Sequence, residues 1–255
     1  MTGRRRVDEQ PFGTLSDLTP LTLATQAGAR RRRRRLPWML ALALLPLLAG
    51  LGWWWFHPAS LAETQLVGAR EPGCLRLVIA SDVSGSMSSL TEPRDRAVDQ
   101  LLAWAPQNLR TDDEVALVSF SDTASVEIPP TPVAQQIVRT GRAAPSGGTS
   151  LAPLLDTIRR LPGTRCRTSL LLLGDGQFGD TPTDEATASR QLADAGIDTF
   201  DFLVPGSTEI PANWQSIYPS APPDFFDGTN PDRTALVFGN HLAELTGQAL
   251  HRTTT

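Results

Sequence analysis

The chain has 255 residues, 40% of them hydrophobic, which is enough to bury the core of one sizeable domain with additional segments. Its formal net charge of −4 hides an uneven distribution: residues 1–35 carry nine arginines and three acidic residues, whereas residues 57–255 carry fourteen arginines and 24 acidic residues. The chain contains no lysine, which excludes a phosphate-binding glycine-rich loop that ends in lysine.

The N-terminal part of the chain has the pattern of a tail followed by a membrane anchor. Residues 1–35 are polar and have no sustained hydrophobic period, so we expect a disordered, arginine-rich cytoplasmic tail. Residues 36–56 are uncharged and almost wholly apolar, and at about 1.5 Å per residue they match the roughly 30 Å of a bilayer core. Six arginines at 30–35 precede this segment and three tryptophans at 53–55 close it. This order predicts a single-pass helix in the cell membrane with everything after it outside the cytoplasm.

Two other interpretations of this region compete with a membrane anchor. The small residues Ser60 and Ala62 would suit a signal peptidase, in which case cleavage near Ala62 would release a secreted protein. The length of the apolar segment and its bulky tryptophans favour an uncleaved anchor. The arginine run would also suit nucleic acid, but membrane orientation explains it fully, so no nucleic-acid partner is expected.

After a short stalk at 57–72, the chain alternates apolar strands with amphipathic helices across a domain at 73–252. This alternation predicts an α/β fold with a doubly wound, mostly parallel sheet flanked by helices. The expected strands are 75–80, 114–121, 168–176 and 197–204, with a possible antiparallel edge at 124–128 that prolines 129, 130 and 132 should end. The expected helices are 93–106, a short one at 132–139, 150–161 capped by Ser150, 183–196 capped by Thr183, and 240–250.

Residues 206–238 are rich in proline, glycine and aromatic residues and have no clear period, so we expect a long loop there. Its aromatic side chains would either add apolar contact area near a binding site or fold back onto the domain. These residues are Trp214, Tyr218, Phe225 and Phe226.

Three polar motifs follow predicted strands or precede a predicted helix: "DVSGS" at 82–86, "SGGTS" at 146–150 and "LLGDG" at 172–176. Together they resemble the von Willebrand factor type A (VWA) domain and its metal-ion-dependent adhesion site. That site has the pattern Asp-x-Ser-x-Ser, then a distant Thr and a distant Asp. The five matching residues, in order, are Asp82, Ser84, Ser86, Thr149 and Asp175.

The resemblance implies a divalent cation, Mg²⁺ or alternatively Mn²⁺ or Ca²⁺. Ser84, Ser86 and Thr149 would touch the ion, and Asp82 and Asp175 would act largely through waters. Carboxylate and hydroxyl oxygens are the ligands that Mg²⁺ prefers, and an ion with an open position would attract a carboxylate from a protein partner. One position departs from the family: a threonine often precedes the last aspartate, where this chain has Gly174.

The resemblance also bears on the two cysteines. Cys74 and Cys166 each lie at the start of a predicted strand, and in the family's sheet those two strands are parallel neighbours. Neighbouring strands are about 4.8 Å apart, close to the spacing that a disulfide needs. We therefore expect a Cys74–Cys166 disulfide, the alternative being two unpaired buried thiols.

The expected function is a membrane-anchored, extracytoplasmic module that binds a divalent cation and recognises an acidic group on a protein partner. No catalytic signature accompanies the motifs, so an enzyme is not expected. The alternative from another class is an assembly or maturation factor that acts with a cytoplasmic ATPase. A hydrolase is a weaker third interpretation.

Overall fold

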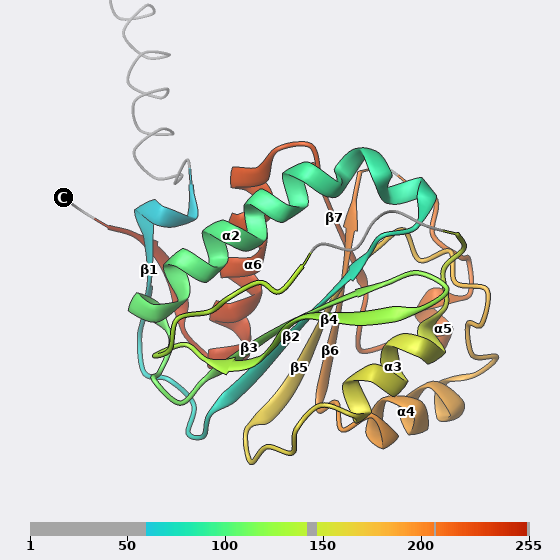
Figure 1. Ribbon diagram of the computed structural model, residues 1–255, viewed down its shortest axis with the longest axis horizontal. Helices are drawn as coiled ribbons and strands as arrows, with labels where there is room; N and C mark the ends of the chain where they lie inside the picture. The colour runs from blue at the N-terminus through green and yellow to red at the C-terminus, as the bar shows by residue number, and fades with distance from the viewer. Residues whose placement is uncertain (1–59, 142–146, 207, 254–255) are drawn as a thin grey trace, which may run out of the picture. The chain divides into compact units, whose positions relative to one another are not determined.

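The computed structural model describes residues 60–141, 147–206 and 208–253 (Figure 1). The predicted tail at 1–35 and the predicted membrane helix at 36–56 lie outside these residues. Among the residues that are described, no helix combines the length and the hydropathy needed to cross a bilayer.

A six-stranded sheet with the order β4-β3-β2-β5-β6-β7 forms the centre of the domain. Its strands are β2 (Leu75–Asp82), β3 (Glu114–Phe120), β4 (Ala124–Pro132), β5 (Arg167–Leu173), β6 (Thr199–Pro205) and β7 (Pro223–Phe226). All neighbours pair in parallel except β4, which runs antiparallel to β3 at one edge. The structure therefore confirms the predicted α/β fold with a mostly parallel sheet.

Helices cover both faces of this sheet, with α2 and α6 on one side and α3, α4 and α5 on the other (Figure 1). Their bounds are α2 (Thr91–Asn108), α3 (Leu151–Arg159), α4 (Glu185–Asp194), α5 (Trp214–Ile217) and α6 (Pro231–Thr246), with 3-10 helices η1 (Leu61–Glu63) and η2 (Gly85–Leu90). Every residue of β2 is buried because the strand is covered on both faces.

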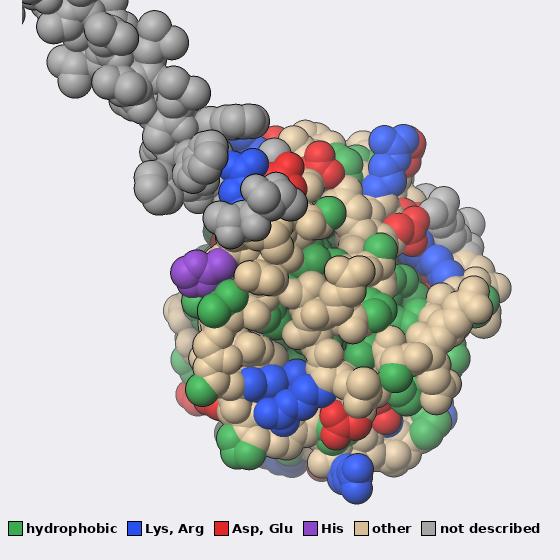
Figure 2. All heavy atoms as spheres, turned by 90° about the vertical axis from the view of Figure 1, so that its left-hand side faces the viewer, with side chains coloured by type: hydrophobic (Ala, Val, Ile, Leu, Met, Phe, Trp, Pro, Cys, Tyr) green, Lys and Arg blue, Asp and Glu red, His purple; other side chains and the backbone are tan. Residues whose placement is uncertain are grey.

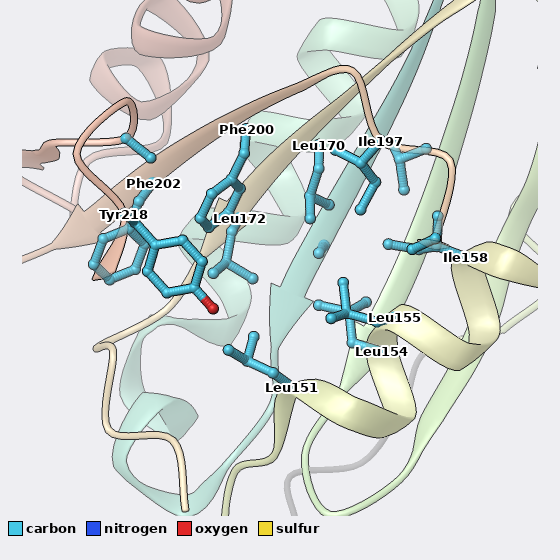
Figure 3. Close-up of a cluster of buried hydrophobic side chains, with 14 of the residues drawn as sticks. Leu151, Leu154, Leu155, Ile158, Leu170, Leu172, Ile197, Phe200, Phe202 and Tyr218 are labelled. Atoms are coloured by element: carbon cyan, nitrogen blue, oxygen red, sulfur yellow. The ribbon is translucent and has the colours of Figure 1, made fainter. Parts of the chain in front are cut away.

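In the core beneath α3, the apolar face of this amphipathic helix is buried against the sheet. Leu151, Leu154 and Ile158 recur at the spacing of one helical face and point at the sheet (Figure 3). They belong to one buried cluster with Leu170 and Leu172, which lie on the same face of β5. This cluster holds α3 against the sheet, and so sets the position of the loop that precedes the helix.

Several local predictions need correction. Strand β4 continues through the prolines to Pro132, since at an edge the missing amide protons cost no ladder hydrogen bond, and residues 132–139 form no helix. Helix α4 is capped by Asp184, whose carboxylate accepts the Thr187 amide at 2.8 Å, and not by Thr183. The Ser150 side chain makes no capping hydrogen bond to α3.

The segment 206–238 is also not a loop. It contains α5, then β7, which adds a sixth strand beside β6, and the first turns of α6, which begins at Pro231. Trp214 and Tyr218 fold back into the core, where the Trp214 Nε1 donates to the Ala221 carbonyl at 2.9 Å. Phe225 is half exposed on the edge strand.

Residues 61–67, which the sequence predicts to be part of the stalk, fold onto the domain. Strand β1 (Thr64–Val67) pairs antiparallel with β8 (Ala249–Arg252) near the C-terminus. The Trp104 indole donates to the Thr64 carbonyl at 2.9 Å, and Leu61 is fully buried. The folded domain therefore includes residues from Leu61 onward.

On the side of the molecule drawn in Figure 2, blue arginine side chains stand beside red acidic ones rather than in one continuous basic patch.

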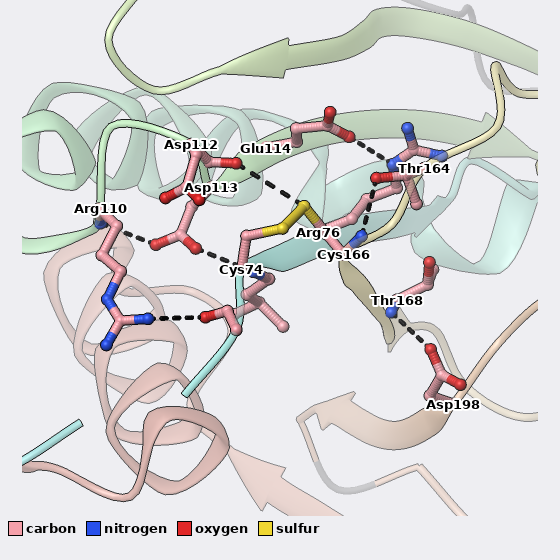
Figure 4. Close-up of a disulfide and its surroundings, with 12 residues drawn as sticks. Cys74, Arg76, Arg110, Asp112, Asp113, Glu114, Thr164, Cys166, Thr168 and Asp198 are labelled. Atoms are coloured by element: carbon pink, nitrogen blue, oxygen red, sulfur yellow. Dashed lines mark hydrogen bonds and ion pairs between the residues drawn. A yellow bond between two sulfur atoms is a disulfide. The ribbon is translucent and has the colours of Figure 1, made fainter. Parts of the chain in front are cut away.

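The predicted disulfide between Cys74 and Cys166 is present, with 4.6 Å between the two Cα atoms (Figure 4). The residues that follow the cysteines, Leu75 and Arg167, are register partners in the β2–β5 ladder, which brings the cysteines side by side. Asp113 supports the same end of the sheet by accepting the Leu75 amide at 2.8 Å. The bond lies at the amino ends of the strands, opposite the predicted metal site.

Candidate metal site

The candidate site lies at the carboxyl ends of the two central strands. Asp82 is the last residue of β2, and Asp175 follows the end of β5 by two residues. The strands are parallel neighbours with Ser81 opposite Leu173, so the two aspartates leave the sheet together. In doubly wound sheets this edge is where ligands bind.

Hydrogen bonds connect four of the five predicted residues. The Ser86 hydroxyl donates to Asp175 Oδ2 at 2.5 Å and lies 3.1 Å from the Ser84 hydroxyl oxygen. The Ser84 amide donates to Asp82 Oδ1 at 2.8 Å. The Gln177 amide donates to Asp175 Oδ1 at 3.0 Å. The two motifs, 89 residues apart, therefore form one cluster of oxygen atoms.

Thr149 belongs to the loop before α3, which packs against the loop that carries Asp175. Its carbonyl accepts the Gly179 amide at 2.8 Å, four residues after Asp175, and its side chain is mostly buried. Thr149 thus reaches the loop that carries Asp175 through a main-chain hydrogen bond. The other four residues are joined by hydrogen bonds between side chains, or by the bond from the Ser84 amide to the Asp82 carboxylate.

The electrostatics of Asp82 suit a bound cation. Its carboxyl group is fully buried, and Oδ2 has no hydrogen-bond partner. Burial raises the pKa of Asp82 to about 6, with the nearby Asp175 raising it further and hydrogen bonds from Ser84 opposing the shift. A buried carboxylate oxygen without a partner costs free energy unless a cation or a donor meets it. The donor set of two carboxylates and three hydroxyls is the hard-oxygen type that Mg²⁺ takes.

Gly174 packs directly against this carboxylate. A Cβ atom at position 174 would lie 3.1 Å from both the Cβ and Oδ2 of Asp82. At Gly174, the backbone that follows β5 therefore lies close to the Asp-x-Ser-x-Ser motif. Where the family often has threonine, a side chain at this position would press on Asp82, which would have to shift by a few tenths of an ångström.

An ion-pair network that the sequence analysis missed contacts the main-chain carbonyl of Asp82. The buried Arg94 on α2 donates from Nη1 to the Asp82 carbonyl at 2.9 Å and from Nη2 to Asp95 at 3.2 Å. Asp95 in turn meets Arg139 at 2.8 Å, and Arg139 pairs with Glu127 at 2.8 Å. The signal available in the sequence was an arginine one residue from an aspartate on the apolar side of a helix.

No group of three or more His, Cys, Asp or Glu side chains in the described part of the chain is arranged to hold a metal ion. The candidate site is of a different composition, since hydroxyls supply three of its five side chains.

Comparison with known proteins supports a VWA domain in this part of the chain. Residues 77–177 match the family model of the von Willebrand factor type A domain, and this segment includes all five candidate residues. No curated protein sequence matches the chain.

Solved structures with the same fold include proximal thread matrix protein 1 from the mussel byssus, with a TM-score of 0.50 at 16% identity over 76% of this chain and 52% of that one. A von Willebrand factor type A protein from Catenulispora acidiphila matches with a TM-score of 0.49 at 19% identity over 70% of this chain and 46% of the other. The mussel protein with a zinc-occupied metal-ion-dependent adhesion site matches with 0.46 at 12% identity over 67% and 48%. The chain spans about half the length of these structures, and at such identities the likeness concerns the fold alone.

Proposed function

We propose that this protein is a membrane-anchored, extracytoplasmic binding module whose VWA domain holds Mg²⁺ and recognises an acidic group on a protein partner. The observation that carries the proposal is the buried, unpartnered Oδ2 of Asp82 within a cluster of hydroxyl and carboxylate oxygens. Mn²⁺ or Ca²⁺ would suit the same oxygens, with different preferences for ligand number and distance.

The roles of the residues follow from their chemistry. Ser84, Ser86 and Thr149 would offer neutral hydroxyl oxygens, and Asp82 and Asp175 would supply negative charge. Because Asp82 and Asp175 would act largely through waters, the cation would keep an open position with positive charge, which would attract a further carboxylate. The bound ion would supply a Lewis-acidic position for the acidic side chain of the partner. No role in this scheme requires a general base or a nucleophile, and we propose a binding protein rather than an enzyme.

The membrane location rests on residues 30–56. An arginine run, an apolar segment of bilayer length and terminal tryptophans together favour an anchored chain with its domain outside the cytoplasm. Protease added to inside-out membrane vesicles should remove the tail at 1–35 and spare the domain. Recovery of a mature protein that begins after Ala62 would contradict the anchor and favour secretion.

Calorimetric titration of MgCl₂ into the full chain in detergent micelles tests the metal site. We expect saturable binding by the wild type, and affinity at least about tenfold weaker for Ser86→Ala and for Asp175→Ala, because each removes an oxygen from the cluster. Ser88→Ala is the matched control, since it removes an exposed hydroxyl from the same 3-10 helix. Its affinity should stay within about twofold of the wild type. No binding by the wild type, or equal losses in Ser86→Ala and Ser88→Ala, would refute the site.

A further inference from the structure

We infer that Asp122, in the turn between β3 and β4, is a positioning residue that sets the place of Thr149 in the metal site. The inference rests on the proposed metal site and adds a residue that lies outside its five-residue motif. The Asp122 carboxylate accepts the Gly148 amide through Oδ2 at 2.8 Å. Gly148 immediately precedes Thr149, so this contact acts on the backbone next to the hydroxyl that would meet the metal.

The turn holds Thr149 from both neighbours. On the other side of Thr149, the Ser150 amide donates to the carbonyl of Ser121 at 3.0 Å. Residues 121 and 122 therefore accept the amides that flank Thr149. The turn accepts one hydrogen bond from each neighbour of Thr149. Two such bonds fix the backbone direction at Thr149 more firmly than one bond would.

The glycines of the "SGGTS" motif fit this contact. A Cβ at Gly148 would lie 2.9 Å from Asp122 Oδ1, and a Cβ at Gly147 would overlap the Asp122 carboxylate. Gly147 also has a φ of 41°, a backbone conformation that favours glycine. The close approach of Asp122 thus gives a reason for both glycines.

A second carboxylate completes the support on the far side of Thr149. Asp180 accepts the amides of Leu151 and Ala152, each at 2.7 Å, at the first turn of α3. This replaces the cap that the Ser150 side chain does not supply. Because Asp180 follows Asp175 in the same loop, it ties the Thr149 loop to the loop of the second aspartate. Asp122, together with the Ser121 carbonyl, ties it to the turn that follows β3.

The test is Mg²⁺ affinity of variants of the full chain in detergent, measured by calorimetry. Asp122→Ala should weaken Mg²⁺ binding about tenfold, in the range found for residues that orient metal ligands. Asp122→Asn keeps an acceptor oxygen and should recover most of the affinity. Gly148→Ala, which pushes against Oδ1, should weaken binding like Asp122→Ala. Asp156→Ala removes a charge of the same sign from the exposed side of α3 and should have the affinity of the wild type.

A double-mutant cycle separates positioning from a general electrostatic effect. If Asp122 acts through Thr149, Asp122→Ala should cost less than about twofold further in a Thr149→Ala background. Full additivity of the two losses would overturn the inference, as would wild-type affinity in Asp122→Ala. Failure of the wild type to bind Mg²⁺ would instead overturn the proposed function. Circular dichroism before titration identifies any variant that is unfolded, and Asp122→Asn and Gly148→Ala then carry the test.

Discussion

Removal of the Cys74–Cys166 disulfide is expected to lower the free energy of unfolding by about 4 kcal/mol. The bond joins residues 92 positions apart, and in the chain-entropy account the stabilisation grows with the length of the closed loop, reaching about 4.7 kcal/mol for a loop of 100 residues. Urea unfolding of the full chain in detergent, followed by circular dichroism, should give this difference between the wild type and the Cys74→Ser, Cys166→Ser double variant.

Two controls make the result specific. Wild-type protein unfolded in the presence of a reductant should reproduce the loss seen in the double variant, since both remove the same cross-link. The Mg²⁺ affinity of the folded double variant should match that of the wild type, because the bond lies at the amino ends of β2 and β5 while the candidate site lies at their carboxyl ends. A loss below about 1 kcal/mol would show that the cross-link does not constrain the unfolded chain as this account requires.

The elements that the sequence predicted well are those whose signal is local and strong. Strands β2 and β5 are apolar on both faces, as central parallel strands should be, and the structure buries them accordingly. Once these strands are neighbours, the pairing of Cys74 with Cys166 follows from their equivalent positions. The meeting of Ser86 with Asp175 follows in the same way, from the shared carboxyl end of the two strands.

The elements that the sequence missed depend on distant partners. Strand β7 is four residues long and begins with proline, so only the free edge of β6 makes it a strand. Strand β1 likewise exists because β8, near the other end of the domain, pairs with it. The contact of Asp122 with Gly148 has no sequence signal, because a side chain that accepts a backbone amide 26 residues away leaves no pattern.

The indole of Trp214 is central to a group of aromatic side chains that reaches toward the site loops. Its ring centroid lies 4.1 Å from that of Phe202 and 6.0 Å from that of Phe178. Phe178 belongs to the loop that carries Asp175, and it contacts Phe120 at the end of β3 with centroids 6.1 Å apart. The rings of Tyr218, Phe200 and Phe202 gather at the same end of the core cluster (Figure 3).

Trp214→Ala should therefore affect both stability and metal binding. Truncation of a fully buried tryptophan leaves a large cavity, and we expect a loss of about 4 kcal/mol in the free energy of unfolding, measured by urea unfolding of the full chain in detergent. Phe178 would lose one of its two aromatic neighbours, so the Asp175 loop should become less ordered and Mg²⁺ affinity should fall severalfold. Trp214→Phe keeps the ring contacts and should retain most of that affinity.

Phe225→Ala is the matched control, because it removes an aromatic ring from the same stretch of sequence at a position that is 50% exposed. Its effect on stability should stay within about 0.5 kcal/mol. If Trp214→Ala loses stability but keeps full Mg²⁺ affinity, the aromatic group supports the core without ordering the Asp175 loop. If Mg²⁺ affinity falls in Trp214→Ala and not in Trp214→Phe, packing against Phe178 helps to hold Asp175 within reach of Ser86. The hydrogen bond between Ser86 and Asp175 would then not be enough to keep the two residues together.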